Sequence, residues 1–447
     1  MKDLKERVRW DSDVYEINEF NKTNLDKINT DISSLTDHLF RNESKKMTAV
    51  LTKIFGAHNI EMAEDVVQDT LIQAINTWKL KGIPDQPKAW LYRVAKNKAI
   101  DILRKNKFSI NYDFTGQDAL LKSEYTMQRA VEQYWSESEI EDHLLQMMFA
   151  CCHPDLSLEN QITLILKSLC GFSTSEVAKA LLSNEETISK RLYRTKEFFK
   201  EHQIKLEAPG SNEILTRLES VLKAIYLLFN EGYNSTHHEK LIRTELMEEA
   251  MSLCNILIHH QLSRLPQSYA LMSLMCFHYA RNQSRLNAEG EIILLEFQDR
   301  KVWSKEWIDL ATSYLSQSST GDYISQYHLE ACIAYEHCIA SEFSKTNWTA
   351  ILHYYRILLQ VTPSPIIYLN YAAAIFKGVG ANEALVTLKQ YTDQQKWQGN
   401  YIYHSLLGEI YKQSGDFDAA RVAFTKAVSL TQSEAEKKLI SKKIALL

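Results

Sequence analysis

Residues 61–107 read EMAEDVVQDTLIQAINTWKLKGIPDQPKAWLYRVAKNKAIDILRKNK, and most of this stretch has the pattern of amphipathic helix. Apolar residues recur at helical spacing before residue 81 and again after residue 88. Between them, KGIPDQP combines a glycine with two prolines, which interrupt helices. The stretch therefore predicts two helices separated by one break.

The first of these helices has one apolar and one acidic face. The apolar face is expected to comprise Met62, Val66, Leu71, Ile75 and Trp78. The opposite face carries Glu61, Glu64, Asp65, Gln68 and Asp69. Taken alone, this pattern also fits a core helix with a solvated acidic side.

The second helix, residues 88–107, combines cationic and aromatic side chains. Its expected buried face is Leu91, Val94, Ala95, Ile102 and Leu103. Cations neutralise phosphates, asparagine bonds base edges, and tryptophan can stack on an unpaired base. The candidate contacts to strand-separated DNA are Trp90, Arg93, Lys96, Asn97 and Arg104. The alternative is a basic solvated face.

A third pattern, residues 171–194, reads GFSTSEVAKALLSNEETISKRLYR and predicts a helix-turn-helix. Ala178 allows close helix approach, while Ile188, Leu192 and Phe199 are expected to be buried. The outward face of the second helix should present Thr187, Lys190, Arg191 and Arg194 to base edges and phosphates. Lys196 is expected to contact phosphate. A purely structural helical hairpin is the alternative.

Just before this motif, Cys151-Cys152-His153-Pro154 invites a zinc interpretation. Adjacent cysteines do not easily bind one ion, and the fourth ligand would have to be Cys170 or a more distant residue. We expect a packed helix end and no metal or other cofactor.

Charge is distributed unevenly along the 447 residues, whose net charge is −5. Residues 88–107 hold seven basic residues and one acid, and residues 190–200 hold five and one. Residues 108–142 between them hold eight acids and two bases. Two basic patches with an acidic spacer suit phosphate binding. Seven scattered cysteines, a charged N-terminus and no long apolar run favour the cytoplasm.

The remaining chain is expected to be helical and partly repetitive. The clearest repeat unit has tetratricopeptide (TPR) spacing at Leu407, Gly408, Tyr411, Ala420, Phe424 and Ala427. Ala372, Ala384 and Leu388 mark a second unit, and residues 348–363 end a third. Such repeats stack into a solenoid whose concave side typically binds peptide or protein. A capping bundle that binds nothing is the alternative.

Together, these motifs resemble the extracytoplasmic-function (ECF) group of bacterial sigma factors, in the sigma-70 family. Residues 63–70 are similar to the acidic helix that docks on core RNA polymerase, and residues 87–101 to the helix that opens the −10 promoter element. Residues 171–194 are similar to the domain that reads the −35 element. Residues 222–233, 291–300 and 151–154 are similar to segments of a subgroup with a large C-terminal helical extension.

The resemblance implies an all-α protein with several domains. We expect an N-terminal extension (1–34), sigma domain 2 (35–107), an acidic linker (108–136), sigma domain 4 (137–204), a helical extension domain (213–320) and TPR-like repeats (322–447). Core polymerase would bind Glu61, Glu64, Asp65, Gln68 and Asp69. The −10 element would contact Trp90, Arg93, Lys96, Asn97 and Arg104, and the −35 element Thr187, Lys190, Arg191 and Arg194.

The predicted function is therefore promoter recognition, strand opening and transcription initiation with core RNA polymerase. The resemblance implies that the extension regulates the factor or is required for its activity, through an intramolecular contact or a protein partner. No catalytic motif is recognisable, so we expect no enzyme. The alternative is a TPR-containing helix-turn-helix regulator or scaffold that binds DNA without engaging polymerase. The acidic face of residues 64–69 distinguishes the two.

Overall fold

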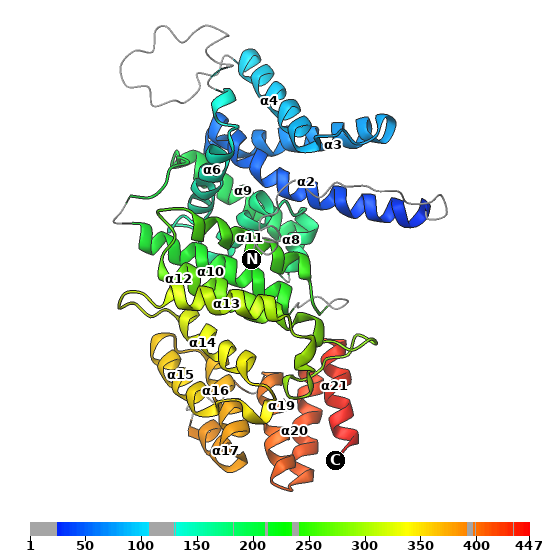
Figure 1. Cartoon of the computed structure of the whole chain (residues 1–447), viewed down its shortest axis with the longest axis vertical. Coiled ribbons are helices and arrows are strands. Elements are labelled where there is room, and N and C mark those ends of the chain that lie inside the picture. Colours follow the sequence, from blue (N-terminus) through cyan, green and yellow to red (C-terminus); the bar gives the residue numbers. More distant parts are fainter. Residues whose placement is uncertain are drawn as a thin grey trace. The chain divides into compact units, whose positions relative to one another are not determined.

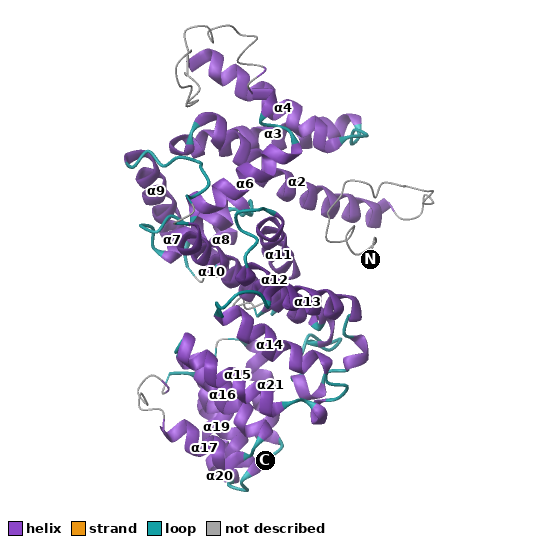
Figure 2. Cartoon of the chain, turned by 60° about the vertical axis from the view of Figure 1, so that its left-hand side comes forward, coloured by secondary structure: helices purple, strands orange, loops and turns teal. Residues whose placement is uncertain are grey.

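The computed structural model describes residues 25–106, 129, 131–181, 183–210, 213–234, 241–390, 397, 399–431 and 433–447. Within these residues every long element is a helix, and the sole β-bridge pairs Leu286 with Ile292 (Figures 1 and 2). The all-α class predicted from the sequence is confirmed. In the described part of the chain, no helix is both long enough and apolar enough to cross a bilayer. The chain divides into two compact units, residues 1–225 and 226–447.

The first unit is built on a long helix, α2 (Leu25–Phe55), against which α3 (Ile60–Lys81), α4 (Pro87–Asn106) and α6 (Glu137–Cys151) pack. Residues 25–34 are mostly polar, so periodicity could not predict the helix that begins ten residues before the expected start at 35. The expected linker, 108–136, falls largely on residues 108–128 and 130, which lie outside the described residues.

The break between α3 and α4 follows from its residue types. Gly82 has φ +80°, a region that favours glycine, and its N–H bonds the carbonyl of Trp78. Pro87 then opens α4, where its missing N–H costs no hydrogen bond. The Trp78 ring lies 5.5 Å from both Phe40 and Trp90 and so joins α2, α3 and α4.

The buried face of α3 differs from the predicted one. Val66 and Trp78 are buried as expected, but Ile75 is 52% exposed, so that part of the prediction was wrong. Met62 and Leu71 are half-buried. The buried stripe runs through Ala63, Val66, Val67, Thr70, Ala74 and Trp78. Small residues in this stripe let α2 approach closely, whereas side-chain size alone had favoured Ile75. In α4, Leu91, Ala95 and Leu103 are buried as predicted, and Val94 and Ile102 are half-buried.

Short capped helices complete the first unit. α7 (Leu158–Leu164) continues into a π-helical turn, η3 (Ile165–Leu169), and is followed by α8 (Thr174–Ala180) and α9 (Glu185–Glu201). Ser173 and Glu176 form a capping box on α8, and the Asn184 side chain caps α9 by accepting from the Thr187 N–H at 2.8 Å. Ile188, Leu192 and Phe199 are buried as predicted.

The helix α10 (Ile214–Tyr233) contains the boundary between the two units, whereas the sequence pattern had placed a boundary at 204–213. The guanidinium of Arg217 donates to the Phe149 carbonyl at 2.6 Å, which attaches the start of α10 to the first unit. Hydrophobic periodicity cannot predict this contact, because Arg217 and Phe149 lie 68 positions apart in the sequence.

In the second unit, α12 (Pro266–Ala280) packs against α11 (Thr244–His259), α13 (Lys305–Ser318) and α14 (Gln326–Ile339). Most of its residues are apolar, and all of them are buried or half-buried. Between α12 and α13, residues 281–304 form the β-bridge between Leu286 and Ile292 and three short 3-10 turns, η4 (Asn282–Ser284), η5 (Leu295–Phe297) and η6 (Arg300–Val302).

Successive helices of the C-terminal part pack against one another: α15 (Trp348–Val361), α16 (Pro365–Gly378), α17 (Ala381–Gln390), α19 (Tyr401–Gln413), α20 (Phe417–Leu430) and α21 (Glu434–Ala445). Most residues that suggested a repeat are buried between these helices; Leu407 and Tyr411 are half-buried. A Cβ on Gly408 would lie 2.5 Å from the Phe424 ring, so glycine is required for this close approach. The assignment of these helices as TPR units stays a prediction.

Candidate polymerase and DNA interfaces

The acidic face of α3 is largely open to solvent. Glu61, Asp65, Gln68 and Asp69 are exposed, opposite the stripe that packs on α2. Further along the helix, Ile72 and Leu80 are 48% and 86% exposed. Together with the exposed Ile75, they continue the acidic face with apolar surface, a combination that suits a protein partner. The sequence prediction missed Ile72 and Leu80. The position of Ile72 beside the acidic face could have indicated an exposed apolar side chain there.

Glu64 differs from its neighbours because α9 reaches it. The Lys196 ammonium lies 3.0 Å from Glu64 and 3.3 Å from Glu61, and the Ser168 hydroxyl donates to Glu64 at 2.6 Å. Burial lowers the pKa of Lys196, but the two carboxylates outweigh it and hold the pKa above its ordinary value. One end of the acidic face is therefore covered by α9. The predicted phosphate contact of Lys196 stays a prediction, and in this structure the residue joins α9 to α3.

Most of the predicted −10 contacts share an exposed side of α4. Arg93, Asn97 and Arg104 are exposed, and Arg104 lies 3.4 Å from Asp101. Lys96 is half-buried and lies 3.4 Å from Glu132. Trp90 is half-buried because its ring meets Trp78 edge to face. The exposed part of the Trp90 ring could stack on an unpaired base.

Polar contacts fix α4 in place. The Tyr92 hydroxyl donates to Glu43 of α2, and burial together with that carboxylate raises the pKa of Tyr92 well above its ordinary value. Lys88 lies 3.1 Å from Glu137 at the start of α6. These contacts hold α4 from two sides, so the exposed residues are presented on a rigid helix.

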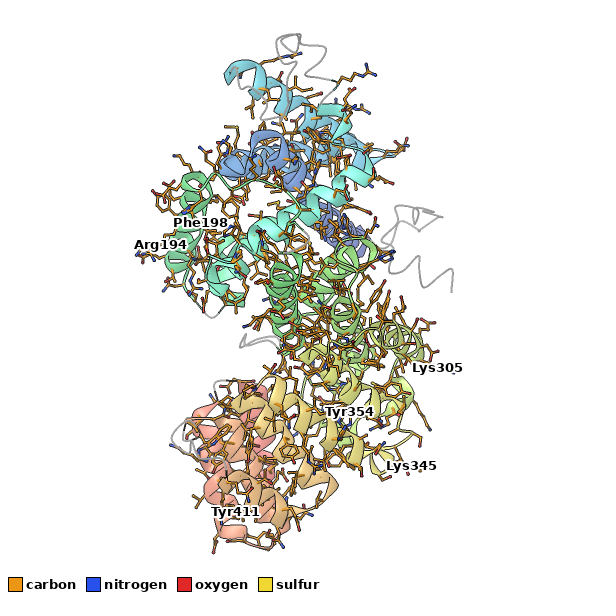
Figure 3. The ribbon with its side chains drawn as sticks, turned by 90° about the vertical axis from the view of Figure 1, so that its left-hand side faces the viewer. Arg194, Phe198, Lys305, Lys345, Tyr354 and Tyr411 are labelled. Atoms are coloured by element: carbon orange, nitrogen blue, oxygen red, sulfur yellow. The ribbon has the colours of Figure 1, made fainter. Side chains whose placement is uncertain are left out.

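The predicted −35 residues lie along α9. Arg194 and Lys190 are exposed, and Figure 3 shows Arg194 at the outer side of the helix. Thr187 and Arg191 are half-buried. Lys190 forms an ion pair at 2.6 Å with Glu186, which lies one helical turn earlier, and both side chains are exposed. The structure thus brings Arg191 and Arg194, three residues apart, to neighbouring positions on the helix.

The cysteine segment lies in packed interior. Cys151, Cys152 and Cys170 are buried, and burial raises the pKa of Cys152 to about 12. In the residues that the structure describes, no group of three or more His, Cys, Asp or Glu side chains could hold a metal ion.

Comparisons with known proteins bear on these surfaces. Residues 39–109, which include α3 and α4, match the family model of sigma-70 region 2, and residues 217–319 match a family of unknown function (DUF6596). The chain is 30% identical over 378 residues to an uncharacterized protein, R00370, of Rhizobium meliloti; this alignment covers 85% of the chain and 88% of that protein.

A second relative carries a functional name. The chain is 30% identical over 132 residues to the ECF RNA polymerase sigma factor SigL of Mycobacterium tuberculosis, covering 29% of this chain and 68% of SigL. No solved structure matches the chain significantly. The region 2 match coincides with the helices that present the acidic and the basic faces, and on this evidence the chain is a member of the sigma-70 family.

Proposed function

We propose that the chain is an ECF sigma factor that works in the cytoplasm with core RNA polymerase. In this proposal α3 docks on polymerase, α4 opens the −10 element and α9 reads the −35 element. The observation that supports it most is the exposed face of α3, where Asp65, Gln68 and Asp69 adjoin Ile72 and Ile75 within the sigma-70 region 2 match. A protein that only binds duplex DNA has no use for such an acidic and apolar surface.

Strand opening by α4 needs no hydrolysis. Unstacking a base step costs a few kcal/mol and can be offset by binding the exposed strand. The exposed Arg93, Asn97 and Arg104 would hold phosphates and a base edge, with Trp90 beside them. The chemistry is that of binding, and the protein is not an enzyme in this proposal.

The packing of α9 against α3 adds a condition to this function. Lys196 pairs with Glu64, whose side chain is 19% exposed, and with Glu61, whose side chain is 67% exposed, so polymerase would gain full access to Glu64 only when α9 separates from α3. We therefore also propose that α9 separates from α3 when the chain binds polymerase. The C-terminal extension would regulate the factor or be required for its activity. The match to the DUF6596 family begins at residue 217, in this extension.

The test is run-off transcription with purified core enzyme on a promoter that requires both elements. Asp65→Lys with Asp69→Lys should abolish co-purification with core, because both carboxylates are exposed and reversal leaves the buried stripe intact. The control is Glu141→Lys, an exposed acid on α6 outside this face.

A second arm concerns the −35 element. Arg191→Ala with Arg194→Ala should retain core binding but lose −35-dependent transcription, at roughly 1–3 kcal/mol per base contact. Lys200→Ala, also on α9, is the control. Core binding that survives the Asp65 and Asp69 reversal unchanged would favour the alternative, a DNA-binding regulator or scaffold outside the polymerase.

A further inference from the structure

A cavity of about 600 Å³ lies in the second unit beside the C-terminal end of α10, and we call it the arginine cavity. Two arginines that flank the turn η4, Arg281 and Arg285, line it and are half-buried. Asparagine side chains from α10 and α16 contribute amides to the wall. The aliphatic part of the wall is the run Ile292, Ile293, Leu294 and Leu295. The volume is typical of small-molecule sites.

Tyr233, also in the wall, holds both guanidinium groups in place. The Cζ atom of Arg285 lies 3.6 Å from the centroid of the Tyr233 ring, and the same group donates to the Tyr233 carbonyl. The Arg281 guanidinium donates to the Tyr233 hydroxyl through Nε at 3.1 Å and also through a terminal nitrogen. The Tyr233 ring in turn stacks on Phe229 at 6.1 Å and contacts His278 at 4.7 Å. The two cations are therefore pre-positioned by the protein's own contacts, which lowers the ordering cost of binding.

No carboxylate of the described residues balances these two charges. Within the described ranges, Tyr233 accepts every hydrogen bond that the two guanidinium groups donate. Burial lowers the pKa of Arg285, and Arg281 lowers it further, against the opposing effect of Tyr233. A guanidinium has more N–H donors than these bonds use. Two like charges that are partly removed from water cost free energy, and a bound anion would offset that cost.

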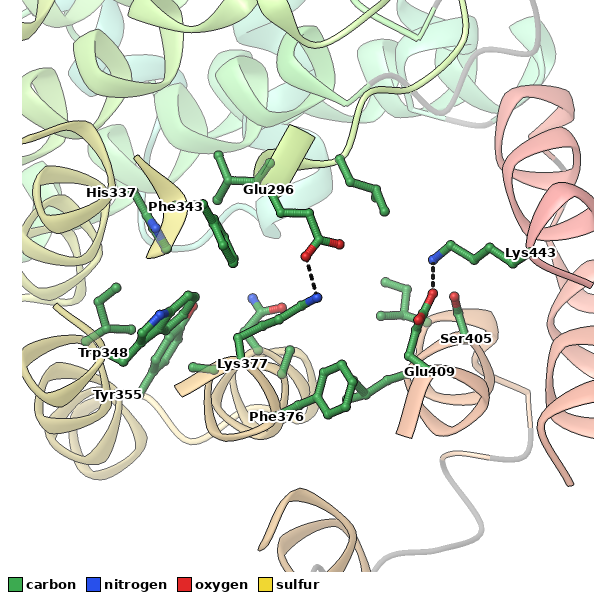
Figure 4. Close-up of a pocket in the computed structure, with 18 of the residues that line it drawn as sticks. Glu296, His337, Phe343, Trp348, Tyr355, Phe376, Lys377, Ser405, Glu409 and Lys443 are labelled. Carbon is green, nitrogen blue, oxygen red and sulfur yellow. Dashed lines mark hydrogen bonds and ion pairs between the residues drawn. The ribbon is translucent and has the colours of Figure 1, made fainter. Parts of the chain in front are cut away.

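A neighbouring cavity of about 470 Å³ has the opposite arrangement of charge. It shares part of its wall with the arginine cavity, but its lysines are paired. Lys377 lies 2.7 Å from Glu296 and Lys443 lies 2.6 Å from Glu409, as Figure 4 shows. In the part of the chain that the structure describes, this region thus neutralises its lysines internally and provides no carboxylate for its two arginines.

The aliphatic side of the arginine cavity is joined to the arginines through the backbone. The Ile293 N–H donates to the Arg285 carbonyl at 2.8 Å, next to the bridge between Leu286 and Ile292. The Gln298 side chain donates to the Ile293 carbonyl at 2.9 Å. The aliphatic residues of this wall are half-buried, so apolar surface stands at a fixed position beside the two cations.

We propose that the arginine cavity is a binding site for a small organic anion whose carboxylate or phosphate group is held by Arg281 and Arg285. The planar guanidinium donates parallel hydrogen bonds to such a group, which a lysine ammonium does not. The volume suits a small molecule, and the aliphatic wall would contact its apolar part. This inference does not depend on the sigma function.

The probes are hexanoate and hexyl phosphate, each titrated into the full-length chain by isothermal calorimetry. At least one should bind, because each joins an oxyanion to an aliphatic chain, and the tighter of the two identifies the preferred group. Hexanol, which lacks the charge, should bind at least tenfold more weakly than that anion. Acetate and inorganic phosphate, which lack the aliphatic chain, should also bind more weakly.

Variants test the two arginines. Arg281→Gln and Arg285→Gln should each weaken binding of the anion at least tenfold. The matched control is Arg264→Gln, which removes an exposed arginine of the same unit outside the cavity and should change the affinity less than twofold. The proposal would be overturned if neither anion bound up to about 1 mM, if hexanol bound as tightly as the anions, or if both glutamine variants bound like wild type.

Hydrogen exchange on the wild-type chain is a readout that needs no folded variant. The saturating anion should slow exchange in residues 229–234 and 281–298, which carry the arginines, Tyr233 and the aliphatic wall. Exchange in α20 should stay the same and serves as the internal reference. Unchanged exchange in both segments at saturation would show that the anion binds elsewhere and would also overturn the proposal.

Discussion

Glu330 on α14 is a carboxyl whose surroundings disfavour its charge. It accepts a hydrogen bond from the Tyr226 hydroxyl at 2.6 Å, and the Tyr226 ring meets Tyr327 at 5.5 Å. Burial raises the pKa of Glu330 from 4.5 to about 7, and the hydrogen bond from Tyr226 offsets only part of this effect. The unfolded chain therefore ionises Glu330 at lower pH than the folded chain does.

The sign of the pH dependence follows. Below about pH 4.5 both states keep the proton, whereas between pH 4.5 and 7 the unfolded state alone releases it, so stability falls as pH rises through this window. Glu330→Gln removes the charge but keeps an acceptor for Tyr226. We expect the variant to gain stability over wild type from pH 5 to pH 8, by on the order of 1–3 kcal/mol. Melting temperatures at both pH values measure this, with Glu434→Gln as control; a gap that shrinks with pH would contradict it.

At the scale of elements, the packing of α9 on α3 depends on a few polar contacts. Lys196 is 17% exposed and Glu64 19%, so their ion pair is partly desolvated and worth more than a fully exposed one. The α9 helix also packs against α7, α8 and the 3-10 turn η1 (Ala57–Asn59), which directly precedes α3. Separation of α9 from α3 therefore also breaks the packing of α9 on η1.

We expect Lys196→Ala to strengthen association with core polymerase three- to tenfold, which corresponds to roughly 0.7–1.4 kcal/mol. The reason is that the variant weakens the contact that covers Glu64 and removes the cation that pairs with the exposed Glu61. Equilibrium binding to core enzyme measures the effect, and Lys200→Ala on the exposed side of α9 is the control. Weaker binding in the Lys196 variant, with unchanged helical content, would show that Lys196 itself serves the polymerase interface.

At the scale of the whole molecule, the question is whether the second unit acts on the first. A truncation must respect the contacts of the first unit, since Lys53 donates to the Leu206 carbonyl at 2.8 Å and Arg217 to that of Phe149. A cut after residue 205 would remove both partners. Residues 1–234 keep these contacts and all of α10.

We therefore expect residues 1–234 to fold, as judged by circular dichroism, but to differ from the full chain in transcription with core enzyme by threefold or more. An extension that regulates the factor, or on which the factor depends, changes the free energy of a step in transcription initiation. The truncation removes that contribution. Equal activity of the two chains in vitro and in cells would show that the extension does not influence transcription by residues 1–234 and serves only as a docking platform.

The sequence alone determined the local structure. Gly82 and Pro87 marked the break between α3 and α4. The buried stripe of α9 followed from periodicity, and the resemblance pointed to the sigma-70 family, to which the chain belongs. These features could be predicted because helix breaking and periodicity act over a few residues.

The tertiary structure decided which faces are free. Ile75 was expected in the core and lies at the surface, because small residues in α3 pack more closely on α2. Lys196 meets Glu64 across 132 residues, and Lys442 meets Glu291 across 151. Periodicity within a helix contains no information about such distant partners, since they depend on how whole helices pack. The sequence thus determined the helices and the family, and the packing determined which side chains of the acidic face are exposed and which, like Glu64, are joined to another helix.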